Sequence, residues 1–368
     1  MVPLLMISGD RSLLQGRQGA FYATLQEFSR HFDRIDILCP FAGESLESPK
    51  AFFGNVHVHP SSSSLLFQPW WIARKGAELI AKYGHEVMTV HEYPPFYNGI
   101  GAGMLSQRTG VPAVYEIHHI IGQPHAASLT EWIGWWLSRL FLRWDLSQAQ
   151  AVRTVNHTVR DTLVRWGVPE QKIAVVPSFY LDSRQLKPDP AVSKEYDVVF
   201  CARLAANKGV LETLRAVAAL PDVSLLVIGD GPMRSTAEDM ARQLQIMDRV
   251  TFAGWLETSL DVFRAIQSAK ILVMNSKSEG GPRVALEAMA LGMPVIVTRV
   301  GVMPDVVRDG ENGVFTTGAV QDLARQIGRV LNDQPLRERM GKAAQRIVDR
   351  FEKGKLIEEY AEFVKRLP

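Results

Sequence analysis

Residues 275–307 read NSKSEGGPRVALEAMALGMPVIVTRVGVMPDVV, and this stretch decides the fold. An apolar run at residues 271–274 precedes it and a second apolar run lies at residues 295–298, so we expect a strand at each place. Pro282, between the two runs, is typical of the first turn of a helix. The stretch therefore predicts a strand, a loop, a helix and a parallel strand, which is the repeating unit of an α/β sheet.

The loop and the helix of this unit carry groups that suit a ligand. Glu279 lies in the predicted loop and Glu287 lies inside the predicted helix, so both carboxylates can point to the mouth of one cleft. Gly280 and Gly281 let the backbone approach a ligand closely, and a helix N-terminus at Pro282 offers amide donors to an anion. These features predict a site for a phosphorylated sugar.

The same alternation of short apolar runs and helical periods continues along the whole chain. Expected helices lie at 21–31, 72–83, 129–144 and 159–167. Expected strands lie at residues 3–8, 34–38, 56–59, 87–91, 113–118 and 151–155, and again at 196–201, 225–228, 250–252, 271–274 and 295–298. The pattern predicts an α/β protein made of two Rossmann-like doubly wound domains that face a central cleft.

A segment with three prolines and no clear period, residues 177–195, separates the two series of strands. We therefore expect one domain at residues 1–185 and a second at residues 186–351. A last helix is expected at residues 352–368, and it can pack back on the first domain.

Composition narrows the class of protein. The 368 residues are 46% hydrophobic and 22% charged, and 41 basic minus 39 acidic residues leave a net charge of +2. Neither a nucleic-acid-binding arm nor an acidic tail is indicated. Only two cysteines are present, and no apolar run approaches the roughly 20 residues that a membrane-spanning helix needs. We expect a cytoplasmic protein that binds no nucleic acid and spans no membrane.

Two cations follow the predicted strand YDVVFC at residues 196–201. They are Arg203 and Lys208, in the run ARLAANKG. Because the turn lies between a strand and a helix start, the pair is suited to hold a diphosphate. A second turn, GDG at residues 229–231, also follows a predicted strand, but alone it is weak evidence.

With these motifs in order, the second half of the chain resembles the family-4 retaining glycosyltransferases of the GT-B fold. The family signature is a Glu, seven residues and a second Glu, here Glu279 and Glu287, preceded by the pair Arg203 and Lys208. The runs at 229–232, 250–255 and 292–307 fall in the family's order, and the resemblance is strong over residues 196–330. The first half resembles the family more loosely, through the glycine loop at Gly16 and the run YEIHH at 115–119.

The resemblance implies transfer of a sugar from a nucleoside-diphosphate sugar to an acceptor hydroxyl, with retention at the anomeric carbon. Glu279, His118, Arg203 and Lys208 are the implied catalytic residues, and no metal or other cofactor is required. Glu287 would bind the ribose hydroxyls, Glu279 the sugar, and the two cations the diphosphate. The full donor-binding set implied by the resemblance is Arg203, Lys208, Glu279, Gly280, Gly281, Pro282, Arg283, Val284, Glu287, Gly16 and Trp255. The acceptor would be a glycan, a lipid-linked molecule or a small molecule.

Other interpretations remain open. Ala202 and Pro282 stand where the family usually has glycines, so the chain could be an inactive sugar-nucleotide-binding subunit, and a GT-B sugar-nucleotide epimerase is a further alternative. The pairs His57 with His59 and His118 with His119 have metal-ligand residues, but neither has a third ligand at a predictable spacing.

The helix expected at residues 129–144 is rich in tryptophan. Helical spacing places Ile133, Leu137, Leu140, Phe141 and Trp144 on an inward face, and Trp132, Trp135, Trp136, Arg139 and Arg143 on the flanks or outside. Exposed aromatic rings beside arginines suit a membrane interface, so peripheral contact through residues 132–144 is one interpretation. The alternative is a helix packed wholly against the sheet or a partner subunit.

Overall fold

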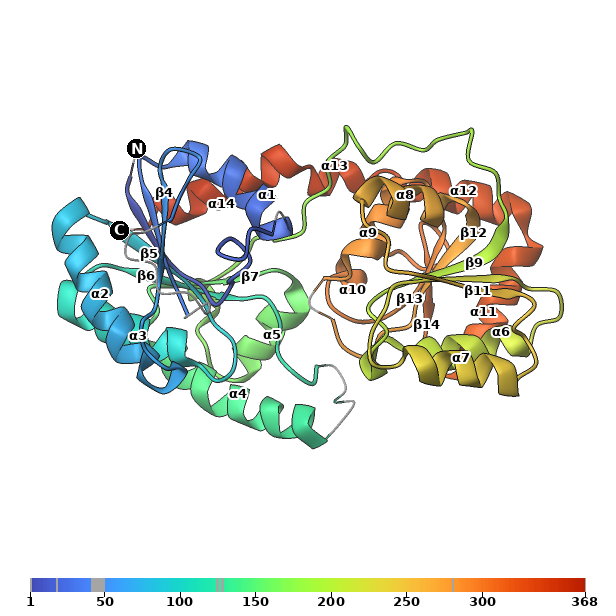
Figure 1. Ribbon diagram of the computed structural model, residues 1–368, viewed down its shortest axis with the longest axis horizontal. Helices are drawn as coiled ribbons and strands as arrows, with labels where there is room; N and C mark the ends of the chain where they lie inside the picture. The colour runs from blue at the N-terminus through green and yellow to red at the C-terminus, as the bar shows by residue number, and fades with distance from the viewer. Residues whose placement is uncertain are drawn as a thin grey trace. The chain divides into compact units, whose positions relative to one another are not determined.

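The computed structural model describes residues 2–17, 19–40, 50–123, 126, 129–279 and 281–367, and it divides into two compact units (Figure 1). Unit 1 comprises Met1–Ile120, Ile133–Ser178 and Gly354–Pro368, and unit 2 comprises Ile121–Trp132 and Phe179–Lys353. The main division, after Ser178, precedes the expected boundary at residue 185. Leu181 is fully buried and its amide donates to the carbonyl of Phe351, which attaches this part of the expected linker to unit 2.

Unit 1 is built on a sheet that has eight strands among the described residues, in the order β3-β4-β2-β1-β5-β6-β7-β8. All neighbouring pairs are parallel except β3 with β4. The strands β1, β2 and β6 are buried along their whole length, as expected where helices cover both faces of a parallel sheet. The strands are β1 (Leu4–Ile7), β2 (Ile35–Cys39), β3 (Lys50–Phe52), β4 (Val56–Pro60), β5 (Val87–His91), β6 (Ala113–Ile117), β7 (Ala151–Thr154) and β8 (Ile173–Val175).

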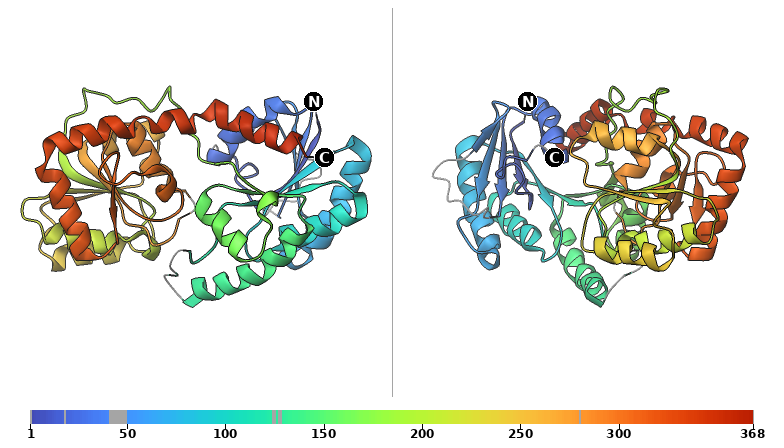
Figure 2. Two further views of the ribbon diagram at one scale, coloured as in Figure 1. Left: turned by 180° about the vertical axis from the view of Figure 1, so that it is seen from behind. Right: turned by 45° about the vertical axis from the view of Figure 1, so that its right-hand side comes forward.

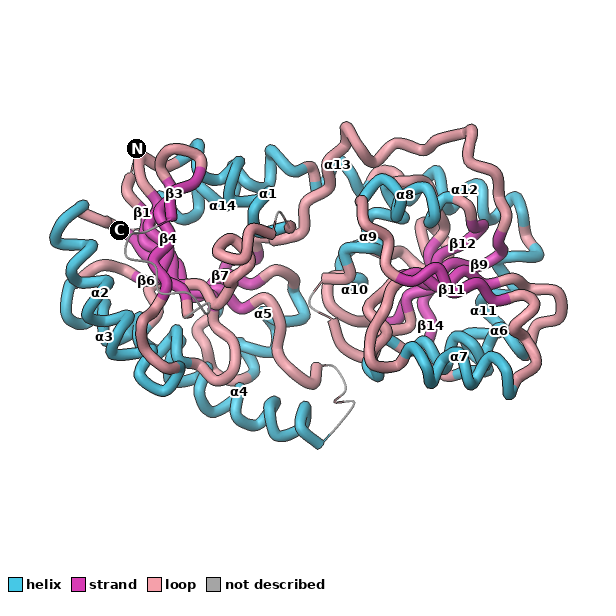
Figure 3. Tube along the Cα trace, in the orientation of Figure 1, coloured by secondary structure: helices cyan, strands magenta, loops and turns pink. Residues whose placement is uncertain are grey.

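The helices of unit 1 connect these strands and lie on both sides of the sheet (Figure 3). The last helix, α14, returns to this unit, where the ring of Tyr360 stacks on Phe28 with centroids 4.6 Å apart. The helical segments are α1 (Ala20–Phe28), η1 (Ser29–His31), η2 (Leu65–Phe67), α2 (Gln68–Tyr83), α3 (Tyr97–Thr109), α4 (Leu129–Gln148), α5 (His157–Arg165), η3 (Glu170–Lys172) and α14 (Lys353–Lys365). Helix α4 belongs to unit 1 from Ile133 onward and α14 from Gly354 onward, and their first residues are assigned to unit 2.

Unit 2 contains a wholly parallel sheet in the order β11-β10-β9-β12-β13-β14. Its strands are β9 (Tyr196–Cys201), β10 (Leu225–Ile228), β11 (Val250–Gly254), β12 (Ala269–Met274), β13 (Val295–Thr298) and β14 (Val314–Thr316). Its helical segments are η4 (Ala206–Lys208), α6 (Val210–Ala218), α7 (Arg234–Gln243), α8 (Ser259–Gln267), α9 (Arg283–Ala290), α10 (Met303–Val306), α11 (Val320–Asn332), α12 (Gln334–Ala344) and α13 (Ile347–Phe351). Two parallel-sheet α/β units confirm the predicted Rossmann-like fold class.

The tryptophan-rich helix α4 does not bury the face that its sequence pattern predicts. Phe141 does pack inward, where it stacks on Phe96. The predicted inward residues Ile133, Leu137, Leu140 and Trp144 are instead exposed, as are Trp132, Trp136, Arg139 and Arg143, which were expected outside. The buried residues of the helix are Ser138, Leu142, Asp145 and Leu146.

Contacts with neighbouring elements explain this rotation of the helix. Trp135, expected on a flank or outside, packs against the core, with its ring 5.9 Å from that of Trp166. Leu142 and Leu146 join the same core, while the small side chain of Ser138 lies at the buried face. Because α4 carries apolar residues on every side, periodicity could not tell which stripe faces the sheet. No described helix is long and apolar enough to cross a bilayer.

Candidate functional site

A cavity of about 460 Å³ lies in unit 2 and collects most of the residues that the sequence predicts to bind a donor. The predicted residues that line it are Arg203, Lys208, Trp255, Glu279, Gly281, Pro282, Arg283, Val284 and Glu287. Gly280 lies outside the described residues, and Gly16 belongs to the loop after β1 in unit 1.

The strand order explains why these residues meet. The cavity is lined from the carboxyl ends of β9, β10 and β12, and the chain reverses its direction of strand addition between β9 and β12. In open parallel sheets the loops leaving such a pair of strands separate and leave a crevice, where ligands bind. The two cations follow β9 and the two glutamates follow β12, so the topology brings both pairs to the same crevice.

The cations stand in two different environments. Arg203 is exposed at the rim, and among the described residues no ion pair is found for it. Lys208 ends η4 and forms an ion pair with Glu279, and their side chains are 20% and 15% exposed. Gly209 follows with φ 74°, and a Cβ there would lie 2.2 Å from the carbonyl oxygen of Asn275, so only glycine allows this turn to lie against the end of β12.

The two glutamates differ in burial and partners. The carboxylate of Glu279 accepts a hydrogen bond of 2.9 Å from the hydroxyl of Ser276 in addition to its ion pair. Glu287 lies on α9, is 8% exposed, and accepts a hydrogen bond of 2.8 Å from Nε of Arg283. Burial raises the pKa of Glu287, and the ion pair with Arg283 opposes this rise. A buried carboxylate with free acceptor capacity is suited to bind hydroxyl groups.

The start of α9 forms one wall of the cavity. Pro282 is the N-cap residue of α9 and Arg283 is its first helical residue, so the proline lies one position before the helix and not, as the sequence predicted, in its first turn. Pro282 has no amide hydrogen, so an anion at this end must use other donors. A Cβ on Gly281 would lie 1.8 Å from the ring of Phe179, so this ring packs directly on the glycine and would have to move for any larger residue.

Residues that follow β11 and residues of α8 also line the cavity, and of these only Trp255 was predicted. Trp255 follows β11 and is 76% exposed beside the cavity, as expected for a residue that meets a ligand. Phe263 and Thr258, from α8 and its N-cap, also line the cavity but were not predicted. Nothing in their sequence neighbourhood marks them, because they reach the cavity through the packing of α8.

His118 lies at the end of β6 in unit 1 and does not belong to the cavity of unit 2. Its ring is 4.7 Å from that of His91, and its Nε2 lies 4.0 Å from the fully buried carboxylate of Glu116. Desolvation lowers the pKa of His118 and the neighbouring His91 lowers it further, so the imidazole is neutral near pH 7. Contact between His118 and the donor sugar would depend on how the two units are arranged, so this contact stays a prediction.

His91, Glu116 and His118 have the residue types and spacing of a metal site, since their ligand atoms lie within 4.8 Å of one another. The carboxylate is, however, already engaged by protein groups. Oε1 of Glu116 accepts from Nη1 of Arg153 at 2.9 Å and from the hydroxyl of Tyr360, and Oε2 lies 2.6 Å from Nε2 of His91. Oε1 of Glu116 is therefore engaged by Arg153 and Tyr360, whereas among the described residues Oε2 pairs with His91 only as a close ionic contact and Nε2 of His118 has no hydrogen-bond partner.

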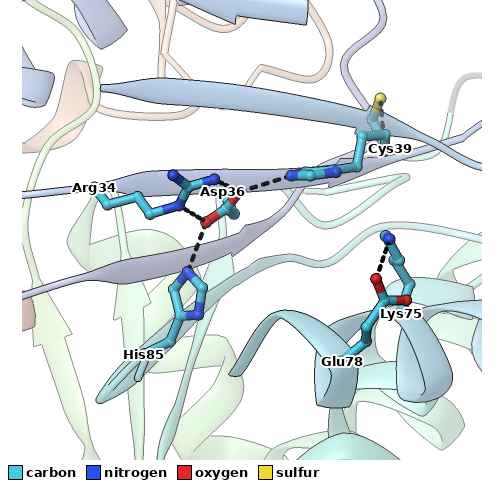
Figure 4. A network of polar contacts seen from close by, with 7 residues as sticks. Arg34, Asp36, Cys39, Lys75, Glu78 and His85 are labelled. Carbon is cyan, nitrogen blue, oxygen red and sulfur yellow. Dashed lines mark hydrogen bonds and ion pairs between the residues drawn. The ribbon is translucent and has the colours of Figure 1, made fainter. Parts of the chain in front are cut away.

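His59, one of the histidines weighed as metal ligands, belongs to a different cluster around Asp36, which Figure 4 shows with Arg34 and His85. His59 lies with Nε2 2.7 Å from Asp36, and His85 approaches the second oxygen of this carboxylate at 2.9 Å. Nε of Arg34 donates to Asp36 at 2.6 Å. Burial alone would raise the pKa of Asp36, but these hydrogen bonds outweigh it and hold the pKa well below its usual range. The histidine pair at residues 57 and 59 therefore includes a structural member of this network.

Comparison with known proteins identifies the family of the chain. Residues 182–347 match the model of glycosyl transferases group 1, and residues 20–180 match that of glycosyltransferase family 4. The N-acetyl-alpha-D-glucosaminyl L-malate synthase of Bacillus anthracis is 27% identical over 327 residues, which are 85% of this chain and 83% of that protein.

Solved structures agree with the fold. A sucrose-phosphate synthase of Thermosynechococcus elongatus superposes over 100% of this chain and 99% of its own, with a TM-score of 0.81 and 19% identity. Anabaena HepE in complex with UDP-glucose superposes over 100% of both chains, with a TM-score of 0.76 and 21% identity. The motifs, the cavity and these matches together show that the chain belongs to the family-4 glycosyltransferases of the GT-B fold.

Proposed function

We propose that this glycosyltransferase moves a hexosyl group from a nucleoside-diphosphate sugar to an acceptor hydroxyl, with retention of anomeric configuration and without a metal ion. The observation that carries the proposal is the meeting of Arg203, Lys208, Glu279 and Glu287 in one cavity of unit 2. HepE, whose fold this chain shares, is described in complex with UDP and with UDP-glucose, which supports a nucleotide-sugar donor here.

Charge separation dominates the barrier of this reaction. The bond between the anomeric carbon and the diphosphate breaks, the leaving group gathers negative charge, and the sugar becomes positively charged. Fixed cations at the diphosphate lower this barrier because they stabilise charge that develops only in the transition state. In the proposal Arg203 and Lys208 supply this charge, and the cations take the role that a divalent metal has in other transferases.

The carboxylates bind and orient the donor. Glu287 is buried at the base of the cavity and would accept hydrogen bonds from the two ribose hydroxyls. Glu279 would accept from hydroxyls of the sugar while it keeps Lys208 directed at the phosphates through their ion pair. His118, as a neutral imidazole, would donate to or accept from the sugar. We assign no protein nucleophile, and the leaving phosphate would take the proton of the acceptor hydroxyl.

The acceptor in this proposal is a hydroxyl of a glycan, of a lipid-linked molecule or of a small molecule. A lipid-linked acceptor would suit a protein that contacts a membrane through residues 132–144. The reaction is proposed to occur in the cytoplasm, because Cys39 and Cys201 are both free thiols, as expected in a reducing compartment.

The test is turnover with a panel of UDP-, GDP-, ADP- and TDP-sugars in excess EDTA, with release of the nucleoside diphosphate as the readout. The anomeric configuration of the product is then read by NMR. At least one donor should be turned over, with a retained anomeric bond. If a donor bound tightly but was not turned over when candidate acceptors were added, the result would favour the alternative suggested by Ala202 and Pro282, an inactive sugar-nucleotide-binding subunit.

A further inference from the structure

Helix α4 carries a continuous apolar stripe on its exposed side. Six large side chains, Trp132, Ile133, Trp136, Leu137, Leu140 and Trp144, are each between 43% and 68% exposed, and we call them the outer face of α4. Their spacing of three and four residues places them along one side of the helix. In Figure 1 and in both views of Figure 2, α4 runs along the lower border of unit 1, with the remainder of that unit above it.

Helix α4 exposes large apolar side chains in addition to those that it buries in the core. Its buried residues include Ser138 and the carboxyl group of Asp145, whereas its exposed side is mainly tryptophan, leucine and isoleucine. Burial of one such side chain is worth about 1.5–3 kcal/mol, so a soluble protein gains nothing from exposing six of them in a row. A contiguous exposed apolar surface of this kind marks an interaction site.

The charge on the outer face identifies the kind of surface it meets. Arg139 and Arg143, one helical turn apart, are exposed beside the stripe, and the guanidinium of Arg139 lies 5.7 Å from the ring centroid of Trp136. Residues 132–144 contain no acidic residue. Of the two acidic residues that flank them, Asp145 is fully buried and Glu131 is partly buried. The outer face therefore presents cations and no exposed carboxylate, which is complementary to an anionic surface.

The combination of residue types fits a lipid bilayer. Tryptophan rings locate at the level of the lipid headgroups, leucine and isoleucine enter the acyl boundary, and arginine keeps its charged end among the lipid phosphates while its stem lies in apolar surroundings. We propose that the outer face of α4 docks this protein onto an anionic bilayer, with the helix axis parallel to the membrane plane. The proposal does not depend on the donor chemistry proposed above.

Co-sedimentation of the full chain with vesicles tests the proposal. We expect the protein to sediment with phosphatidylcholine vesicles that contain phosphatidylglycerol, and to do so less as salt rises, because the attraction between basic residues and anionic lipid is screened. Arg139→Gln with Arg143→Gln should weaken partitioning by about 30-fold, since each basic residue near such a surface contributes about 1 kcal/mol. Vesicles of phosphatidylcholine alone should bind the protein more weakly.

Apolar variants separate the outer face from exposed apolar groups elsewhere. Leu140→Ser with Trp144→Ser should abolish sedimentation with the anionic vesicles, and both positions are exposed, so circular dichroism should show an unchanged fold. The matched control is Met247→Ser with Leu260→Ser, which removes two exposed apolar side chains from unit 2 and should leave vesicle binding unchanged.

Several results would overturn the proposal. One is a parent protein that stays in the supernatant with anionic vesicles, and another is a Leu140→Ser/Trp144→Ser variant that sediments as the parent does. Analytical ultracentrifugation without lipid supplies the third. If the parent were a dimer that the Leu140→Ser/Trp144→Ser variant dissociates, the outer face of α4 would be an interface between two copies of the chain. Because these readouts need no donor, failure of the membrane proposal and failure of the transferase proposal are distinguishable.

Discussion

Replacement of Lys208 by methionine should slow sugar transfer by about two to three powers of ten while the protein remains folded. The substitution keeps most of the length of the side chain and removes its charge. Lys208 lines the cavity of unit 2 and is held there by its ion pair with Glu279. If the proposal is right, the lost group is one that stabilises the departing diphosphate.

The magnitude follows from the partial burial of the pair. The side chains of Lys208 and Glu279 are 20% and 15% exposed, so a phosphate against Lys208 would lie in surroundings with an effective dielectric constant of about 20. Two unit charges about 4 Å apart then interact by about 4 kcal/mol. Each power of ten in rate corresponds to about 1.4 kcal/mol, so complete loss of this interaction would slow the reaction by nearly three powers of ten. Screening by water weakens the interaction and lowers the expected effect towards two powers of ten.

The assay is the initial rate of nucleoside diphosphate release at saturating donor, with circular dichroism to confirm the fold. Lys270→Met is the matched control, because Lys270 lies near the amino end of β12, whereas the cavity lies at the carboxyl ends of the strands, and Lys270 pairs with Asp197. Its rate should equal that of the parent. A Lys208→Met protein with a near-parental rate at saturating donor would refute the electrostatic role of this residue.

Four further outcomes are expected. Activity should persist in excess EDTA, and a loss that magnesium or manganese restores would reopen the histidine cluster as a metal site. Glu279→Gln should weaken binding of the nucleoside-diphosphate sugar more than that of the nucleoside diphosphate, as measured by calorimetry. Equal losses of affinity for the two ligands would show that Glu279 does not bind the sugar. Burial raises the pKa of Asp145 to about 7, so the folded protein keeps a proton that the unfolded chain releases near pH 4. The free energy of unfolding should therefore fall as pH rises from about 4 to 7. Asp145→Asn should flatten that dependence in urea titrations, and an unchanged slope would contradict the assignment. Arg153→Met should lower the free energy of unfolding by about 3–5 kcal/mol because it leaves Glu116 buried without its cation, and the added substitution Glu116→Gln should restore part of the loss.

Sequence patterns located the buried parallel strands well. The predicted strands at residues 87–91, 196–201, 225–228 and 295–298 coincide with β5, β9, β10 and β13. Strands covered on both faces are almost continuous apolar runs, which no other element of this length imitates. The strands β3, β8 and β14 were not predicted, because each has three residues and at least one that is only partly buried.

The meeting of the candidate donor-binding residues in one cavity could be predicted because they follow directly after strands that are adjacent in the sheet. Arg203 and Lys208 leave β9, and Glu279 leaves β12, so a local pattern of strand, turn and helix was enough to place them. The packing of Phe179 on Gly281 had no such local signal, since it joins residues about 100 positions apart.

Two other features of unit 1 depend on contacts that no local pattern records. The hydroxyl of Tyr360 bonds to Glu116 across 244 residues of sequence, and it is joined there by Arg153. The buried face of α4 packs on Phe96 and Trp166, and neither of these residues is near the helix in sequence. In both cases the sequence shows whether the residue is polar or apolar, but it does not show which distant residue contacts it.

Calorimetric titration of the intact protein with nucleoside diphosphates in excess EDTA tests the central claim most directly, because it reports on the cavity of unit 2 without an acceptor. At least one of UDP, GDP, ADP and TDP should bind with a stoichiometry of one. Arg203→Met and Lys208→Met should each weaken that binding by about tenfold to a hundredfold, the usual cost of a lost hydrogen bond to a charged group. Absence of binding by all four nucleotides, or affinities that neither substitution changes, would contradict the claim that this cavity holds the diphosphate of the donor.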